Sequence, residues 1–233
     1  GRTIQIFGLS GAKELPAYFL GDISFAGIVM TDHTGVVLPD WSPPNTPPQG
    51  VMGLDFLTRY TVHVDTRENV IRLYDPPAGP DIGRDWNAVK MAPLNRTGSG
   101  PTLYTIDLRI GSALIPCILD LGASGTIFNT AALREMVQGL RYSSGGRGDF
   151  MSTGSRINDV FDVRDTVRPI RIQTVKAGRA MWRQKVYIIY DAQIFEDLGF
   201  EKRPTCLVGA DMFADRSIIF DFARETLYIG PQR

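Results

Sequence analysis

One short segment combines the residue types that acid–base chemistry needs. Residues 117–126 read Cys-Ile-Leu-Asp-Leu-Gly-Ala-Ser-Gly-Thr, so an apolar strand leads into Asp120 and then into a turn of small residues. A carboxylate at the end of an apolar strand is costly to bury and needs hydrogen-bond donors or a chemical task. The small residues after it let backbone N–H groups approach whatever the carboxylate holds. Taken alone, the segment fits a turn-capping aspartate as well as a reactive one.

An internal repeat in the sequence favours a reactive Asp120 over a turn-capping one. Residues 53–65 and 209–221 align without a gap at an offset of 156 residues. Each copy reads Gly-x-Asp with apolar flanks, then a polar turn and an alternating strand that ends in Asp. A second short strand follows each copy, at 70–74 and at 226–229. Two similar β-hairpins could arise by chance, but the ungapped match favours duplication and predicts two related lobes.

The elements that would position these residues are mostly short strands. Runs rich in β-branched and aromatic residues, bounded by turn formers, predict strands at residues 4–7, 60–65, 186–190 and 217–220. The best helical segment is 130–137, with Asn129 or Thr130 as its N-cap and Gly139 as its stop. A second helix is predicted at 191–198. The sequence therefore predicts a mainly β fold with few short helices.

Together, the motif and the repeat resemble the retropepsin-like aspartic peptidases of the pepsin clan. That family has an apolar strand followed by Asp-Thr/Ser-Gly-Ala/Ser, which residues 118–124 resemble. Its supporting apolar-apolar-Gly is matched by 207–209 and by 51–53. Its glycine-containing flap is matched in position by 150–155 and, in the first lobe, by 7–11. The resemblance covers nearly the whole chain and implies the retropepsin or pepsin-like acid-protease fold.

The resemblance also implies how the chain is divided. Residues 1–78 would be the C-terminal part of a first lobe from its flap onward, 79–100 a linker, and 101–233 a complete second lobe. The second aspartate would then lie upstream of Gly1, on an N-terminal fragment of the precursor, or on a second copy of the chain. We rank the upstream fragment first, and we expect the chain, which runs from Gly1 straight into a strand, to be a processed or truncated product.

The activity that the resemblance implies is that of an aspartic endopeptidase acting on polypeptides. Asp120 would be one of two catalytic aspartates that share a proton and activate a water molecule between them. The implied substrate-binding residues are Gly122, Ala123, Ser124, Met151, Thr153 and Gly154. Leu121 stands where the family has a Thr or Ser whose hydroxyl braces the two loops. A second hypothesis therefore stays open, a catalytically inactive peptide-binding or regulatory module of the same fold.

The amino-acid composition argues against several other classes of protein. The 233 residues include 25 Lys+Arg and 25 Asp+Glu, and this zero net charge argues against a nucleic-acid partner. No apolar run approaches the ~20 residues of a membrane span, and we expect neither a metal nor a cofactor. In the resembled fold the strands of Cys117 and Cys206 lie close together, but we expect two separate buried thiols. The resemblance to this family suggests a protein of the bacterial periplasm or a secreted protein.

Overall fold

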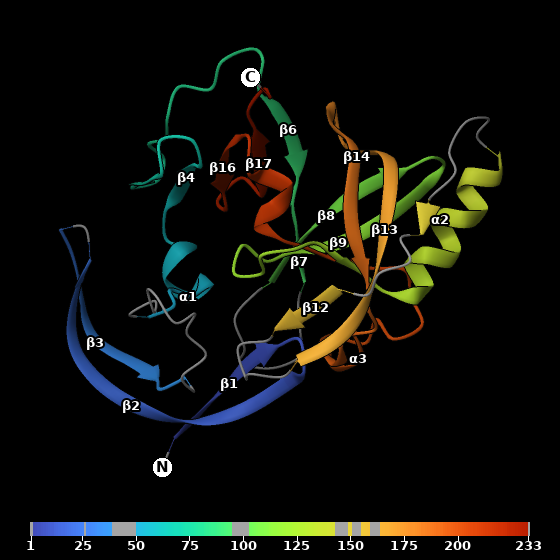
Figure 1. Cartoon of the computed structure of the whole chain (residues 1–233). Coiled ribbons are helices and arrows are strands. Elements are labelled where there is room, and N and C mark those ends of the chain that lie inside the picture. Colours follow the sequence, from blue (N-terminus) through green and yellow to red (C-terminus); the bar gives the residue numbers. More distant parts are fainter. Residues whose placement is uncertain are drawn as a thin grey trace.

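Short strands dominate the architecture (Figure 1). The computed structural model describes residues 2–25, 27–38, 50–94, 103–142, 149–150, 155–158 and 164–232. The strands are β1 (Thr3–Gly8), β2 (Gly11–Phe25), β3 (Ile28–Val36), β4 (Thr61–Asp65), β5 (Val70–Tyr74), β6 (Asn87–Lys90), β7 (Ala92–Leu94), β8 (Leu103–Ile110), β9 (Ala113–Leu119), β10 (Ile127–Phe128), β11 (Asp149–Phe150), β12 (Ser155–Asn158), β13 (Arg164–Ala177), β14 (Ala180–Ile189), β15 (Cys206–Val208), β16 (Ser217–Asp221) and β17 (Thr226–Ile229). The helices are α1 (Leu54–Leu57), α2 (Thr130–Tyr142), α3 (Gln193–Asp197) and the 3₁₀ turn η1 (Ala210–Phe213). The predicted mainly β class with few short helices is confirmed.

A closed barrel forms the centre of the molecule. Its strands follow one another in the order β13, β14, β10, β15, β9 and β8, and β8 returns to β13 where Arg109 lies opposite Lys176. The alternation along β8 explains why this sequence is a barrel strand. Ile106, Leu108 and Ile110 are at most 2% exposed, while the residues between them face solvent. The apolar face of each strand therefore lines one shared core.

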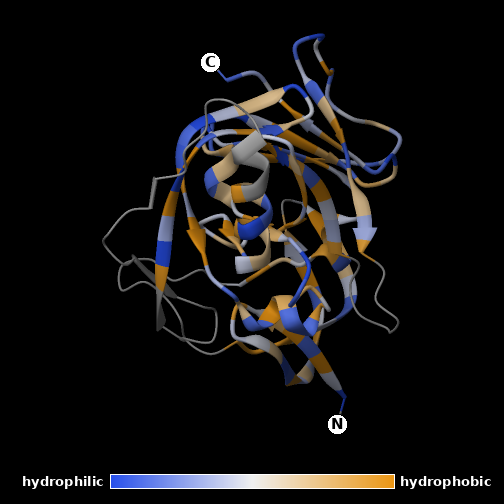
Figure 2. Cartoon of the chain, turned by 90° about the vertical axis from the view of Figure 1, so that its right-hand side faces the viewer, coloured by the Kyte–Doolittle hydropathy of each residue, from blue (hydrophilic) through white to orange (hydrophobic). Residues whose placement is uncertain are grey.

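Helix α2 packs on this barrel, on the side that faces the viewer in Figure 2. Its buried residues Ala132 and Met136 are four apart and lie on one face. Asn129 is the N-cap, since its Oδ1 accepts the N–H of Ala132 at 2.8 Å. The predicted stop at Gly139 is wrong, because the helix continues to Tyr142. One glycine costs a helix only about 1 kcal/mol, which the surrounding turns outweigh.

A five-stranded sheet joins the two copies of the repeat, in the order β5, β4, β16, β17 and β6. Strands β4 and β16 pair antiparallel with His63 opposite Ile219. These two residues are equivalent positions of the repeat, 156 residues apart. The residue two before His63 pairs with the residue two after Ile219, and the converse pair also forms. An approximate twofold axis therefore passes between His63 and Ile219.

Helices α1 and η1 begin at equivalent glycines of the repeat. Gly53 has φ −90° and ψ 177°, and Gly209 has φ −88° and ψ 176°. The two copies of the repeat thus have the same local conformation. The division into lobes at 79–100 remains a prediction, and the described part of that stretch contains β6 and β7 with a fully buried Met91 between them.

The three-stranded sheet β1-β2-β3 arches away from the barrel at the lower left of Figure 1. The turn between β1 and β2 reaches back to the barrel side. There the N–H of Ala12 donates to Oδ2 of Asp197 in α3 at 2.7 Å. In the parts of the chain that the structure describes, no helix is long and apolar enough to cross a membrane.

Candidate active site

Asp120 lies where β9 ends inside the barrel wall. Strands β9 and β15 run parallel with Leu119 opposite Val208, and the N–H of Asp120 donates to the Val208 carbonyl at 3.0 Å. The carboxylate Oδ1 accepts the N–H of Gly122 at 2.9 Å. The small residues after Asp120 therefore fold back and present a backbone donor to its carboxylate, which is the arrangement of a turn-capping aspartate.

Burial is the main influence on the pKa of the Asp120 carboxyl. The side chain is half-buried, and this loss of solvation raises the pKa of its carboxyl above the usual range. The N–H groups of Gly122 and Ala123 lower the pKa of the same carboxyl, but burial is the larger effect. The net effect is that the Asp120 carboxyl holds its proton more tightly than an exposed aspartate does.

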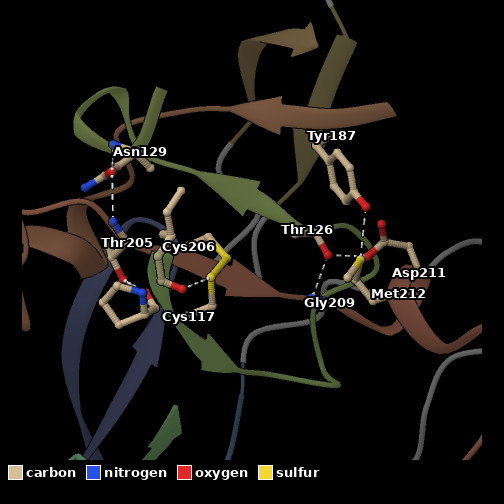
Figure 3. Close-up of a disulfide and its surroundings, with 12 residues drawn as sticks. Cys117, Thr126, Asn129, Tyr187, Thr205, Cys206, Gly209, Asp211 and Met212 are labelled. Carbon is tan, nitrogen blue, oxygen red and sulfur yellow. Dashed lines mark hydrogen bonds between the residues drawn. A yellow bond between two sulfur atoms is a disulfide. The ribbon is translucent and has the colours of Figure 1, made fainter. Parts of the chain in front are cut away.

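Thr126 fastens the Asp120 loop to the second copy of the repeat (Figure 3). Its hydroxyl donates to Oδ1 of Asp211 at 2.7 Å and accepts the N–H of Gly209 at 3.1 Å. One residue along, the N–H of Ala210 donates to the Ala123 carbonyl at 2.8 Å. Thr126 and Gly209 are both buried. These three bonds hold the middle and the C-terminal end of the loop against the start of η1.

Gly209 must be glycine because the loop backbone occupies the space of a side chain. A Cβ built on it would lie 2.6 Å from the carbonyl carbon of Gly125 and 2.8 Å from the carbonyl oxygen of Ala123. Contacts that short do not occur between such atoms. The apolar-apolar-Gly pattern at 207–209 is thus explained by the close approach of the Asp120 loop.

The predicted substrate-binding residues divide into two groups. Gly122 and Ser124 are exposed beside Asp120, and Ala123 is half-buried, so these three lie on or under the same loop. Leu121 is 36% exposed. The remaining three, Met151, Thr153 and Gly154, lie outside the described residues. Their assignment to substrate binding stays a prediction.

The turn at residues 7–11, which the resemblance identifies as a flap, connects β1 to β2. Phe7 and Leu9 pack on an apolar cluster that includes Phe195 of α3 and touches Ala123. A Cβ on Gly11 would lie 2.8 Å from Cγ of Gln193, which shows how closely the turn approaches α3. The turn and the Asp120 loop therefore share one apolar support.

Sequence reasoning missed the roles of Thr126 and Asp211. Asp211 is half-buried, and burial raises the pKa of its carboxyl while the Thr126 hydroxyl and the Lys185 ammonium lower it. The Lys185 Nζ also donates to the Asp211 carbonyl at 2.6 Å. The available signal was the repeat itself, which has an aspartate two residues after the glycine in both copies, at Asp55 and Asp211.

The expectation of two separate thiols is wrong. Cys117 and Cys206 form a disulfide between β9 and β15. The parallel register places them directly opposite each other, with 4.4 Å between their Cα atoms. The bond thereby ties the strand that leads to Asp120 to the strand that leads to Gly209. Among the described residues, no three His, Cys, Asp or Glu side chains gather as a metal site would require.

Comparison with known proteins gives a likeness of fold. No family model matches the sequence, and no curated protein sequence matches it. Among solved structures, the chain is similar to a retropepsin-like aspartic protease from Rickettsia conorii, at 13% identity over 62% of this chain and 92% of that one, with a TM-score of 0.35. It is also similar to Basic 7S globulin from soybean, at 11% identity over 98% of this chain and 71% of that one, with a TM-score of 0.44. At these values the likeness is confined to the coarse fold.

Proposed function

We propose that this chain is part of an aspartic endopeptidase and that Asp120 is one of its two catalytic carboxyl groups. One observation carries the proposal. The Asp120 carboxyl is half-buried at a strand end with a raised pKa, on a loop fixed at both ends to Val208 and to η1. Carboxyl groups with a perturbed pKa at the end of a strand, on a loop held by hydrogen bonds, are candidates for acid–base chemistry.

The reaction needs a second carboxyl close to Asp120. In its ionised form one carboxylate removes a proton from water, and the resulting hydroxide attacks the carbon of the scissile amide. The other carboxyl, still protonated, donates its proton to the carbonyl oxygen. When the tetrahedral intermediate breaks its C–N bond, the carboxyl that took the proton from water gives that proton to the amine nitrogen, and a hydroxyl of the intermediate returns its proton to the other carboxylate as the C=O bond re-forms. Two close carboxyls share one proton because both cannot ionise together.

The test is cleavage of a peptide library by the full-length gene product, from about pH 3 to about pH 8, beside two variants. Asp120→Asn keeps an oxygen that accepts the Gly122 N–H but removes the titrating group. We expect it to lower kcat by at least ~10²–10⁴-fold. Asp107→Asn is the matched control, because Asp107 is an exposed aspartate on β8.

Equal cleavage by wild type and Asp120→Asn would reject the assignment of Asp120. An absence of cleavage by a folded full-length protein at every pH would favour the second hypothesis, a peptide-binding module. The first substitution to test would then be Leu121→Thr, since the hydrocarbon side chain of Leu121 cannot form the hydrogen bond that a hydroxyl makes.

A further inference from the structure

Positive charge gathers on the two hairpins that close the barrel. Residues 103–119 and 164–189, which form β8–β9 and β13–β14, hold eight Lys and Arg residues and two Asp residues. The whole chain, by contrast, is neutral, with 25 residues of each sign. This part of the molecule therefore attracts anions, although the protein as a whole carries no net charge.

Two of these cations meet where the barrel closes. Arg109 of β8 lies directly opposite Lys176 of β13, and both residues are exposed. In the part of the chain that the structure describes, neither side chain has an ion-pair or hydrogen-bond partner. Like charges that face each other across an antiparallel pair repel. The closure of the barrel thus contains a repulsive pair that a bound anion would relieve.

A cavity of about 260 Å³ lies beside this pair. Arg109, Lys176, Thr174 and Gly111 line it. Gly111 opens the two-residue turn between β8 and β9 with φ 60°, a conformation that glycine adopts without strain, and it has no side chain to fill the cavity. Thr174 is half-buried and adds a hydroxyl. The nearest acidic residue along β8, Asp107, is not part of this lining.

The donors of the cavity define the kind of ligand that fits it. A guanidinium presents a planar fork that binds two oxygens, an ammonium binds as a point charge, and a hydroxyl donates one further hydrogen bond. Two cations balance two negative charges, and a tetrahedral anion has oxygens enough for all three side chains. The cavity is smaller than the ~300–1,000 Å³ of sites for drug-sized ligands, so the bound group is small.

We propose that this cavity, here named the seam cavity, binds a tetrahedral oxyanion with two negative charges, that is, a phosphate or sulfate group. Arg109 binds two of its oxygens, and Lys176 and Thr174 bind the others. The anion then links β8 to β13 at the position where these strands pair. Its binding therefore stabilises the closed barrel.

The seam cavity is separate from the candidate active site. Gly111 lies just before β9 and Asp120 lies just after it. The seven residues of β9 span about 20 Å at ~3.3 Å per residue. Anion binding at the seam cavity does not depend on the proposed peptidase activity, and Asp120→Asn should leave it unchanged.

The experiment titrates the chain from Gly1 to Arg233 with methyl phosphate, sulfate and acetate while backbone amide signals are followed by NMR. Near pH 7.5, methyl phosphate and sulfate should shift the amides of Gly111 and Thr174 with a Kd below about 1 mM, and acetate should bind at least about tenfold more weakly. Lowering the pH to about 5 should weaken methyl phosphate by up to about tenfold, because the second pKa of a phosphate monoester is about 6. Sulfate keeps both charges and should bind equally well at the two pH values.

Charge-removing variants test whether the seam cavity is the site. Arg109→Gln and Lys176→Gln should each weaken the binding of methyl phosphate and sulfate by about tenfold or more. Arg183→Gln is the matched control, because Arg183 is an exposed cation opposite Thr174 on β14 that does not line the cavity. Equal weakening by all three variants, acetate binding as tight as that of sulfate, or an absence of shifts at Gly111 and Thr174 would each overturn the proposal.

The melting temperature provides a second readout at matched ionic strength. Without an anion, Lys176→Gln should melt no lower than the wild type, because it removes repulsion between the two strands. Methyl phosphate at about ten times its Kd should raise the melting temperature of the wild type by about 3 °C and leave that of Lys176→Gln nearly unchanged. A wild type that does not respond, or a Lys176→Gln variant that melts several degrees lower without an anion, would contradict the proposed binding.

Discussion

Removing the Thr126 hydroxyl should release the Asp120 loop from its support. Thr126→Val keeps nearly the same shape in a buried site but orphans the N–H of Gly209 and removes the donor to Asp211. An orphaned buried N–H costs about 1–3 kcal/mol, and a hydrogen bond to a charged group is worth about 1.5–3 kcal/mol. Asp211 is only half-buried, so its contribution belongs at the low end of that range. After a gain of about 1 kcal/mol for burying a methyl in place of the hydroxyl, the net loss is about 1.5–3.5 kcal/mol.

Thr126→Ser is the matched control, since it keeps the hydroxyl and loses one buried methyl. It should cost about 1 kcal/mol. Urea denaturation near neutral pH gives both free energies of unfolding, with the slope unchanged if the unfolded state is the same. The Val variant should also raise the pKa of Asp211 further, because the hydroxyl bond that lowers it is gone. A Ser variant less stable than the Val variant would refute this account of the loop.

Two further predictions concern pH and redox state. Burial first, and Arg72 second, lower the pKa of His63, whose ring nitrogens are buried without a hydrogen-bond partner among the described residues. The unfolded chain therefore binds a proton at His63 more tightly than the folded chain does, and the free energy of unfolding should fall as the pH drops below about 6.5. In His63→Phe this fall should be less steep. Urea midpoints that change with pH in the same way in both proteins would contradict this. Reduction of Cys117–Cys206, which spans 89 residues, should lower the free energy of unfolding by about 2–4 kcal/mol, measured with and without reductant. The Cys117→Ala/Cys206→Ala double variant should be insensitive to reductant.

Much of the local structure could be predicted from the sequence because its signals are short-range. The alternating runs at 217–220 and 226–229 became β16 and β17, and the Asn129 cap was recognisable from its residue type. The repeat also predicted that 53–57 and 209–213 would behave alike, and both begin a helical turn at a glycine. These features depend on a residue and its near neighbours.

The sequence could not predict what depends on register between distant strands. Whether Cys117 and Cys206 join follows from the parallel pairing of β9 with β15, and a shift of one residue would send their side chains to opposite faces. The bond from Thr126 to Asp211 likewise spans 85 residues. The Gly139 stop failed for a related reason, since packing of α2 on the barrel outweighs the local preference of one glycine.

The symmetry of the β4–β16 ladder bears directly on the proposed reaction. A single carboxyl cannot be ionised to take a proton from water and protonated to give one to a carbonyl oxygen in the same step. In the proposed reaction Asp120 would fill one of these roles, and a second carboxyl would fill the other. The β4–β16 ladder, which is symmetric about His63 and Ile219, relates the two copies of the repeat to each other. Gly53 has the same backbone conformation as Gly209, against which the backbone of the Asp120 loop packs. By this symmetry, the second carboxyl of the proposed reaction would lie near Gly53 as the Asp120 loop lies against Gly209.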